Sequence, residues 1–372
     1  MVYKTLPHYR VAFFEGVRSR LAAEGIRFRL IVGQPDTESA SRYDTTALPW
    51  AESISNRALR AGNRTLIWQP VLRSICRSDL VIVEQASRLL VNPVLATWRR
   101  LGGPKFALWG HGINRDDSTA SRIGEWWKRR TIRSCDWWFA YTEGTAALVS
   151  SAGFASDRIT IVQNAIDTAA LAEAHLAVDA AAMKKTRSEL GIGSPHVAVY
   201  VGSLYAGKRL GFLIAAADIV RLQLPDFELL IIGDGPHRTT VETAAATRPW
   251  LHVLGVRRNE ELARLCSVAT VMLMPGLVGL AVLDSFALEL PMITSAVTNH
   301  SPEIEYLEDG RNGVIVLEAA SERAYASAVV ATMTNQQLLD RLCAGCREAA
   351  MRYTVEEMVE RFSVGVQKAL AR

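Results

Sequence analysis

The residues best suited to chemistry in this sequence follow glycine turns. Gly276 and Gly279 lie in a short loop that runs into a helical pattern at Leu280 and Ala281. The first N–H groups of a helix have no partner within it and lie at its positive end, so they can bind a phosphate oxyanion. Glycine lets the backbone approach such a ligand closely. The alternative is an ordinary turn between a strand and a helix.

A pair of cations, Lys208 and Arg209, follows another turn, after the apolar run 197–201. A fixed cation beside a phosphate stabilises negative charge that develops there during a reaction. A solvated Lys-Arg pair would have the same spacing, so spacing alone leaves both interpretations open.

His111 lies between two glycines, directly after the apolar run 106–109. This position at a strand end favours a hydrogen bond to a substrate, although a lone histidine is more often structural. Tyr9 and Arg10 stand at the start of another helical pattern. They are expected either to line a binding site or to cap that helix.

Both halves of the chain alternate short apolar runs with helical patterns. The runs predicted as buried parallel strands are 28–32, 80–84, 106–109, 136–141, 159–162, 197–201, 227–232, 271–274, 291–295 and 314–317. The segments predicted as helices are 11–23, 210–222, 260–268 and 280–288. This alternation predicts an α/β protein of two doubly wound domains. Ligands of such sheets bind beyond the carboxyl ends of the strands, where the glycine turns, Lys208 and His111 are expected.

The two halves differ in charge. Residues 1–175 carry a net charge of +7 and eight of the nine Trp, whereas residues 176–372 carry −3. A basic half suits phosphates, an anionic membrane surface or nucleic acid. The total of +4 and the lack of a recognised motif argue against nucleic acid. The pattern predicts a domain at 1–168, an Ala-rich helical linker at 169–189 and a domain at 190–352.

The composition excludes several classes of protein. An apolar content of 49% excludes a disordered chain. Five cysteines at unrelated positions give no disulfide framework, and Cys343 and Cys346 have no companion pair for a metal. Without an apolar run of about 18 residues or a signal-peptide pattern, we expect a cytoplasmic protein with no bound metal.

A series of motifs then points to a family. They are Val201–Lys208 (VGSLYAGK), Gly233–Pro236 (GDGP), Leu254-Gly255, Met274-Pro275, Gly279–Pro291 (GLAVLDSFALELP) and Asp309–Gly313 (DGRNG). In this order they resemble the retaining, sugar-nucleotide-dependent glycosyltransferases of family 4, strongly over 200–316. The resemblance implies the GT-B fold, two facing Rossmann-like domains with a cleft between them. It also implies that a C-terminal helix, here 355–372, returns to the first domain.

The resemblance assigns a role to each candidate residue. His111 would face the donor sugar, and Lys208 would stabilise the donor diphosphate. Asp284 would accept hydrogen bonds from the ribose hydroxyls. The other donor-binding residues would be Ser203, Arg209, Gly235, Val256, Gly276, Gly279, Leu280 and Ala281. Tyr9 and Arg10 would contact the acceptor.

Two features depart from the family pattern. The family usually has two glutamates spaced E-x7-E, and these positions are Gly276 and Asp284 here. The arginine of the family's G-R-L turn is Ser203 here. The resemblance therefore supports binding of a nucleotide sugar better than it supports any particular sugar.

The activity that the resemblance implies is hexose transfer with the anomeric configuration kept. The donor would be a nucleoside-diphosphate sugar carrying UDP or GDP, with no further cofactor. The acceptor would be a hydroxyl of a saccharide or lipid-linked saccharide, in bacterial surface or exopolysaccharide biosynthesis. Two alternatives stay open. One is a sugar-nucleotide 2-epimerase of the same fold, and the other is a catalytically degenerate scaffold that binds nucleotide sugars.

A basic and aromatic stretch runs from Arg115 to Arg133 and includes Trp126-Trp127. It is suited to an anionic membrane surface, which would place the protein on the inner face of the plasma membrane. The alternative is that the tryptophans belong to the core and the arginines are solvated.

Overall fold

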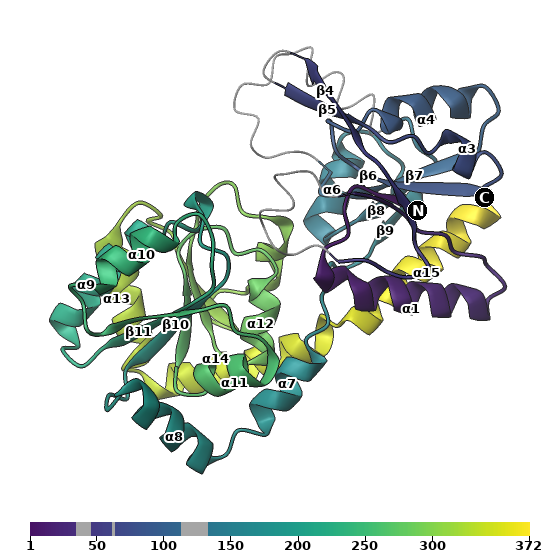
Figure 1. The fold of residues 1–372 in the computed structure, drawn as a ribbon. Coiled ribbons are helices and arrows are strands. Elements are labelled where there is room, and N and C mark those ends of the chain that lie inside the picture. The colour runs from purple at the N-terminus through teal and green to yellow at the C-terminus, as the bar shows by residue number, and fades with distance from the viewer. Residues whose placement is uncertain (35–45, 62–63, 113–132) are drawn as a thin grey trace. The chain divides into compact units, whose positions relative to one another are not determined.

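The structure is a computed structural model that describes residues 1–34, 46–61, 64–112 and 133–372 (Figure 1). The chain divides into two compact units. The first comprises Met1–Asp167 together with Val355–Arg372, and the second comprises Thr168–Thr354. The cleft expected between the two units stays a prediction.

Within the described residues, the first unit has a seven-stranded, wholly parallel sheet in the order β3-β2-β1-β6-β7-β8-β9. Its strands are β1 (Val2–Tyr3), β2 (Ile31–Gly33), β3 (Glu52–Ile54), β6 (Leu80–Glu84), β7 (Lys105–Gly110), β8 (Trp137–Ala140) and β9 (Ile159–Ile161). The central strands are continuous apolar runs because both faces of the sheet are covered. Because these strands are parallel, the carboxyl ends of β6, β7, β8 and β9 lie at the same edge of the sheet.

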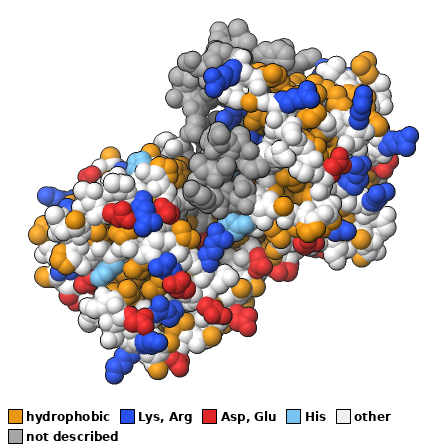
Figure 2. Space-filling model, viewed as in Figure 1, with side chains coloured by type: hydrophobic (Ala, Val, Ile, Leu, Met, Phe, Trp, Pro, Cys, Tyr) orange, Lys and Arg blue, Asp and Glu red, His pale blue; other side chains and the backbone are white. Residues whose placement is uncertain are grey.

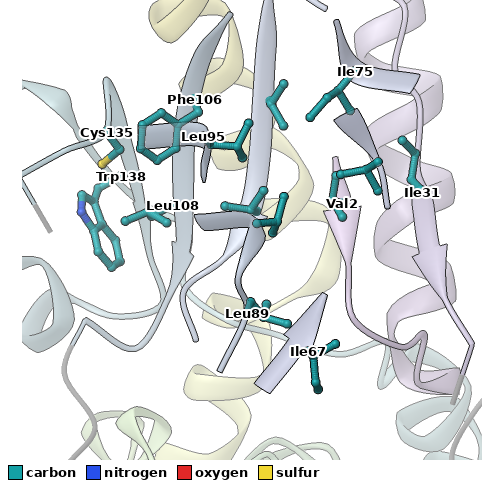
Figure 3. Close-up of a cluster of buried hydrophobic side chains, with 14 of the residues drawn as sticks. Val2, Ile31, Ile67, Ile75, Leu89, Leu95, Phe106, Leu108, Cys135 and Trp138 are labelled. Carbon is teal, nitrogen blue, oxygen red and sulfur yellow. The ribbon is translucent and has the colours of Figure 1, made fainter. Parts of the chain in front are cut away.

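One face of this sheet packs on a large cluster of buried side chains (Figure 3). Phe106, Leu108 and Trp138 are at most 1% exposed and belong to the same cluster as Val2 of β1 and Ile31 of β2. Burying side chains of this size stabilises a fold by about 1.5–3 kcal/mol each. The cluster therefore holds the strands whose ends carry the polar residues.

The other face packs on α1 (Val11–Ala23) and on the C-terminal α15 (Val355–Ala371). The spacing of Phe13, Phe14, Val17 and Leu21 gives α1 one apolar face, as the sequence predicts, and all four are buried. The rings of Phe13 and Phe362 lie 5.3 Å apart, which joins α1 to α15. The remaining elements are the antiparallel hairpin β4 (Arg57–Ala61) and β5 (Arg64–Trp68), α3 (Leu72–Ile75), α4 (Val91–Arg100), α6 (Glu143–Ser151) and the 3₁₀ turns η1 (His8–Arg10) and η2 (Ser156–Arg158).

The second unit, all of which is described, has a six-stranded parallel sheet in the order β12-β11-β10-β13-β14-β15. Its strands are β10 (Val197–Val201), β11 (Glu228–Ile232), β12 (Leu251–Gly255), β13 (Val271–Met274), β14 (Met292–Ser295) and β15 (Gly313–Val316). Its helices are α7 (Ala169–Leu176), α8 (Ala180–Leu190), α9 (Leu210–Gln223), α10 (Arg238–Ala245), α11 (Asn259–Cys266), α12 (Ala281–Ala287), α13 (Glu322–Met333) and α14 (Gln336–Arg352), with 3₁₀ turns η3 (Ala206–Lys208) and η4 (Pro302–Tyr306). On its viewed surface, acidic and basic side chains are interspersed (Figure 2).

The segment predicted as a linker, 169–189, instead forms α7 and α8, and both belong to the second unit. α7 packs on α11 and α12. Arg264 of α11 donates hydrogen bonds to Thr186 and Glu189 of α8. Alanine-rich sequence favours a helix wherever it lies, so composition alone does not separate a linker from a packed helix.

No helix in the described ranges is long and apolar enough to cross a membrane. The same ranges contain no group of three or more His, Cys, Asp or Glu side chains placed to hold a metal ion.

Candidate active site

Four loops meet at the carboxyl edge of the second sheet, each following one strand. We define them as loop A (202–209, after β10), loop B (233–237, after β11), loop C (255–258, after β12) and loop D (275–280, after β13). Main-chain hydrogen bonds connect all four. The Leu204 N–H donates to the Asp234 carbonyl at 2.9 Å, and the Gly233 N–H donates to the Gly255 carbonyl at 2.9 Å. The Leu277 N–H donates to the Gly207 carbonyl at 2.9 Å, so loops A and D are also joined directly.

Glycine is required where these loops touch. A Cβ added at Gly233 would lie 1.9 Å from the Gly202 carbonyl oxygen, and one added at Gly235 would lie 2.5 Å from the Leu204 carbonyl oxygen. A Cβ added at Gly276 would lie 2.3 Å from the Gly207 carbonyl oxygen. Three positions that the sequence marks as turn glycines are thus points of direct contact between backbones. They hold the loops in one fixed arrangement.

Lys208 is buried where loops A and D meet. Its Nζ donates hydrogen bonds to the carbonyl of Leu277 and, at 3.3 Å, to that of Val278. Burial lowers the pKa of Lys208 to about 8, because the charged ammonium loses hydration there. A nearby anion would restore the charged form. The side chain predicted to hold a phosphate is therefore fixed in the structure, and no acidic side chain in the described part of the chain forms an ion pair with it.

Asp284 lies on the first turn of α12, directly after loop D. Burial raises the pKa of its carboxyl to about 7. Among the described residues, no hydrogen bond or ion pair reaches its carboxylate oxygens, and the side chain is partly exposed. A carboxylate in this state binds hydroxyl donors strongly, because it exchanges little water for them.

The backbone between Lys208 and Asp284 offers donors. Gly279 takes a φ of +61°, and no atom lies within 4 Å of a Cβ added there, so the surface above it is open. The N–H groups of Gly279 and Leu280 donate no hydrogen bond to any described residue. Ala281 then begins α12. The binding of the donor phosphates by these groups and Lys208 stays a prediction.

Three other predicted donor residues take different positions. Arg209 donates to the Pro275 and Ala319 carbonyls at 3.2 and 2.7 Å, and its guanidinium lies 3.9 Å from the centroid of the Phe212 ring. It therefore holds loop D in place. Ser203 is exposed, and its carbonyl accepts the Tyr200 hydroxyl at 2.8 Å. Val256 is 51% exposed in loop C, where it presents an apolar surface to solvent.

His300 supports loop D, although no sequence signal singled it out. It is 5% exposed, its Nδ1 accepts the Val278 N–H at 3.3 Å, and its Nε2 donates to the Ser295 carbonyl at 2.8 Å. These two bonds define the neutral tautomer with the proton on Nε2. Only the folded structure reveals this role, because His300 lies beyond the following strand β14.

In the first unit, His111 is exposed directly after β7, and its ring centroid lies 4.5 Å from that of Tyr141 at the end of β8. The structure thus places His111 at the carboxyl edge of the first sheet. Tyr9 is half-buried in η1.

Arg10 corrects an expectation. Its side chain is 2% exposed, and its guanidinium donates to the Asn164 side chain and to the Ala165 carbonyl. The rings of Trp109 and Tyr141 lie 5.7 and 5.9 Å away. A side chain enclosed in this way does not contact an acceptor, so we replace the acceptor-binding role of Arg10 with a structural one.

Most of the basic stretch 115–133 lies outside the described residues, and its predicted membrane role stays a prediction. Arg133 is described, and its Nε donates to the Ala152 carbonyl at 2.8 Å.

Known proteins match this chain in both units. The family model described as "Glycosyl transferases group 1" matches residues 195–335, and "Glycosyltransferase Family 4" matches residues 15–170. The alpha-D-kanosaminyltransferase of Streptomyces kanamyceticus is 24% identical over 136 residues, covering 35% of this chain and 34% of that protein. The chain spans less than half the length of the curated relatives it matches.

Solved structures share the fold over nearly the whole chain. The Anabaena Alr3699/HepE structure in complex with UDP has a TM-score of 0.70 at 12% identity and covers 98% of this chain and 99% of that one. Sucrose-phosphate synthase from Thermosynechococcus elongatus has a TM-score of 0.70 at 14% identity and covers 100% and 98%. This likeness confirms the predicted α/β fold of two doubly wound domains. The family models together match far more than half of the sequence, and the chain belongs to the family 4, or group 1, glycosyltransferases.

Proposed function

We propose that this chain is a retaining glycosyltransferase that moves a hexose from a nucleoside-diphosphate sugar to a hydroxyl of a saccharide or lipid-linked saccharide. The observation that carries the proposal is the placement of Lys208 and Asp284 on either side of the open loop D. UDP is the first nucleotide to test, because solved HepE structures of the same fold contain UDP and UDP-glucose.

A nucleoside-diphosphate donor would supply binding partners for both Lys208 and Asp284. The ammonium group of Lys208 lies among carbonyl groups, and its own pKa is lowered. A bound diphosphate would return the side chain to the charged form. Asp284 has a raised pKa, and two ribose hydroxyls would stabilise its carboxylate. A hydrogen bond to a charged group contributes about 1.5–3 kcal/mol. Two such groups on one rigid set of loops favour a nucleoside diphosphate over either part alone.

The same groups would assist the reaction. Negative charge grows on the diphosphate as the sugar leaves, and Lys208 with the N–H groups of Gly279 and Leu280 would stabilise it. The family resemblance implies that the leaving phosphate assists attack on the same face of the sugar, which retains the configuration. His111 is proposed to donate or accept a hydrogen bond at the sugar.

Gly276 favours a change in sugar recognition. A side chain at 276 is incompatible with the Gly207–Lys208 backbone as it lies, so this chain holds the donor sugar without a carboxylate at that position. The same observation keeps the degenerate scaffold as the competing proposal. The scaffold would bind the nucleotide and release no free nucleoside diphosphate.

The experiment is thermal unfolding of the protein with UDP, GDP, dTDP and ADP, followed by turnover. A ligand at about 100 times its Kd stabilises the native state by about 2.7 kcal/mol. One nucleotide raising the Tm above the others identifies the donor class, and its sugars are then tested for release of free nucleotide. Binding without release supports the scaffold, and turnover of UDP-GlcNAc without an acceptor supports the epimerase. No shift with any nucleotide would contradict the proposal.

A further inference from the structure

The carboxyl edge of the first sheet carries an acidic side chain that the sequence did not single out. Glu84 is the last residue of β6, which lies between β1 and β7 in the sheet. It pairs in register with Trp109, and the Gln85 N–H donates to the Trp109 carbonyl at 2.7 Å. His111 follows two residues later on the neighbouring strand. Glu84 and His111 therefore end adjacent strands at the same edge.

The Glu84 side chain is held in place through one carboxylate oxygen, and its other oxygen has no hydrogen-bond partner among the described residues. The Lys4 N–H donates to its Oε2, and Asn92 Nδ2 donates to its main-chain carbonyl at 2.9 Å. Within the described residues, no hydrogen bond reaches Oε1 and no ion pair forms with the carboxylate. The guanidinium of Arg10 lies in the same region, but it donates hydrogen bonds to Asn164, Ala165 and Met358. Glu84 is also partly exposed, so its second oxygen can be reached by a ligand.

Two amide oxygens in this part of the first unit also lack a hydrogen-bond partner among the described residues. Asn56 Oδ1 and Gln85 Oε1 are buried without a partner in the described part of the chain. Asn56 is held next to Lys4, because its Nδ2 donates to the Lys4 carbonyl at 3.0 Å. Gln85 lies against Gly110, where an added Cβ would be 3.4 Å from Oε1. Both oxygens are enclosed, so in this structure a ligand hydroxyl can reach the Glu84 carboxylate but neither of these amides.

We propose that Glu84 binds hydroxyl groups of the saccharide acceptor. The inference rests on the proposed function, and it names a residue for the acceptor where Arg10 no longer serves. A carboxylate oxygen is a hydrogen-bond acceptor, and a sugar presents several hydroxyl donors on one face. Burial raises the pKa of Glu84 to about 7. Above that pH the carboxylate is charged, and a charged acceptor roughly doubles the strength of a hydrogen bond.

The test compares transfer with hydrolysis. UDP release from the UDP-sugar is measured without an acceptor, and then with a panel of octyl glycosides (β-glucoside, β-galactoside, α-mannoside and β-N-acetylglucosaminide). Glu84→Gln keeps the shape and the hydrogen bond from Lys4 but removes the charge. We expect it to raise the KM for the octyl glycoside at least about tenfold, while donor KM and hydrolysis stay within a factor of about two.

The matched control is Asp79→Asn. Asp79 is an exposed carboxylate directly before the same strand, at the opposite edge of the sheet, so its loss should change neither KM. An unchanged acceptor KM in Glu84→Gln would overturn the inference, and so would an equal loss of hydrolysis and transfer. Hydrolysis with no transfer to any glycoside would overturn a saccharide acceptor. If no nucleotide binds the wild type, the proposed function itself fails, which separates the two results.

Discussion

The contact between loops A and D depends on glycine at 276, and one added methyl group tests it. In Gly276→Ala the new Cβ would lie 2.3 Å from the Gly207 carbonyl oxygen and 2.6 and 2.7 Å from the carbonyl carbon and Cα of Lys208. Ordinary contact begins at 3.4 Å, so one loop must move by roughly 1 Å. Neither neighbour is a flexible side chain, and overpacking of this kind costs about 1–3 kcal/mol.

The displacement also reaches the ligand site, because Lys208 donates to the carbonyls of loop D. We therefore expect Gly276→Ala to lower the Tm of the second unit by about 2–12 °C, at about 2–4 °C for each kcal/mol. The Kd for UDP should rise about tenfold, as expected when the lysine loses its fixed position. Differential scanning calorimetry and isothermal titration calorimetry measure the two effects separately.

Gly211→Ala is the control. Gly211 lies in the first turn of α9, and no atom would lie within 4 Å of its added Cβ. Alanine there should leave UDP affinity unchanged and stabilise the helix slightly. The reasoning is refuted if Gly276→Ala is within about 0.5 kcal/mol of the wild type with the same Kd for UDP. Gly276→Glu, which restores the family residue, should bind UDP no better than Gly276→Ala.

Four further predictions concern single sites. Lys208→Ala should lower turnover about 100-fold or more, and a rate within a factor of about three of wild type would remove Lys208 from the mechanism. Burial raises the pKa of Asp284 from 3.8 to about 7, so the folded protein keeps a proton that the unfolded chain loses. Stability from this group is therefore full below about pH 4 and is lost as the pH rises to about 7. Without ligand, Asp284→Asn should then raise the Tm at pH 7.5 but not at pH 4, while nucleoside affinity falls; equal differences at both pH values would contradict this. His300→Ala removes two hydrogen bonds behind loop D and should cost about 1–3 kcal/mol and weaken UDP binding, measured by calorimetry; UDP binding as tight as wild type would show that loop D holds without it. Reversing the charge of Arg129 and Arg130 should weaken cosedimentation with anionic liposomes, and unchanged cosedimentation would leave the basic stretch as a solvated face.

Strands buried on both faces were predictable from the sequence. The runs 80–84, 197–201 and 271–274 form β6, β10 and β13 with the predicted bounds, and helix 11–23 forms α1. Each of the three strands contains a run of consecutive apolar side chains, which predicts burial on both faces of the sheet, and the helix has apolar side chains at helical spacing. β12 was not predicted as a strand, because it is a half-buried edge strand that includes His252. Edge strands lack the uniform burial that makes an apolar run distinctive.

The sequence predicted the positions of the loops that form the candidate site. It did not predict whether a given side chain in that site is buried or exposed. Glycine turns after strands placed loops A, B and D, and the structure joins these loops directly. Nothing in the sequence distinguished Arg10, which is enclosed, from Glu84, which is partly exposed. That difference comes from Trp109, Tyr141 and Asn164, which reach Arg10 from distant parts of the chain.

The two departures at the E-x7-E positions have different physical consequences. Asp284 keeps a carboxylate at the start of α12, one methylene shorter than glutamate, and its oxygens still lack a partner among the described residues. Gly276 lacks the other carboxylate. The space that a side chain at this position would need is occupied by loop A, which lies against Gly276. Replacing one residue therefore cannot restore the family arrangement: loop A would have to move as well, and Lys208 would move with it. If the protein turns over a nucleotide sugar, its recognition of the sugar must have changed together with the packing of loops A and D.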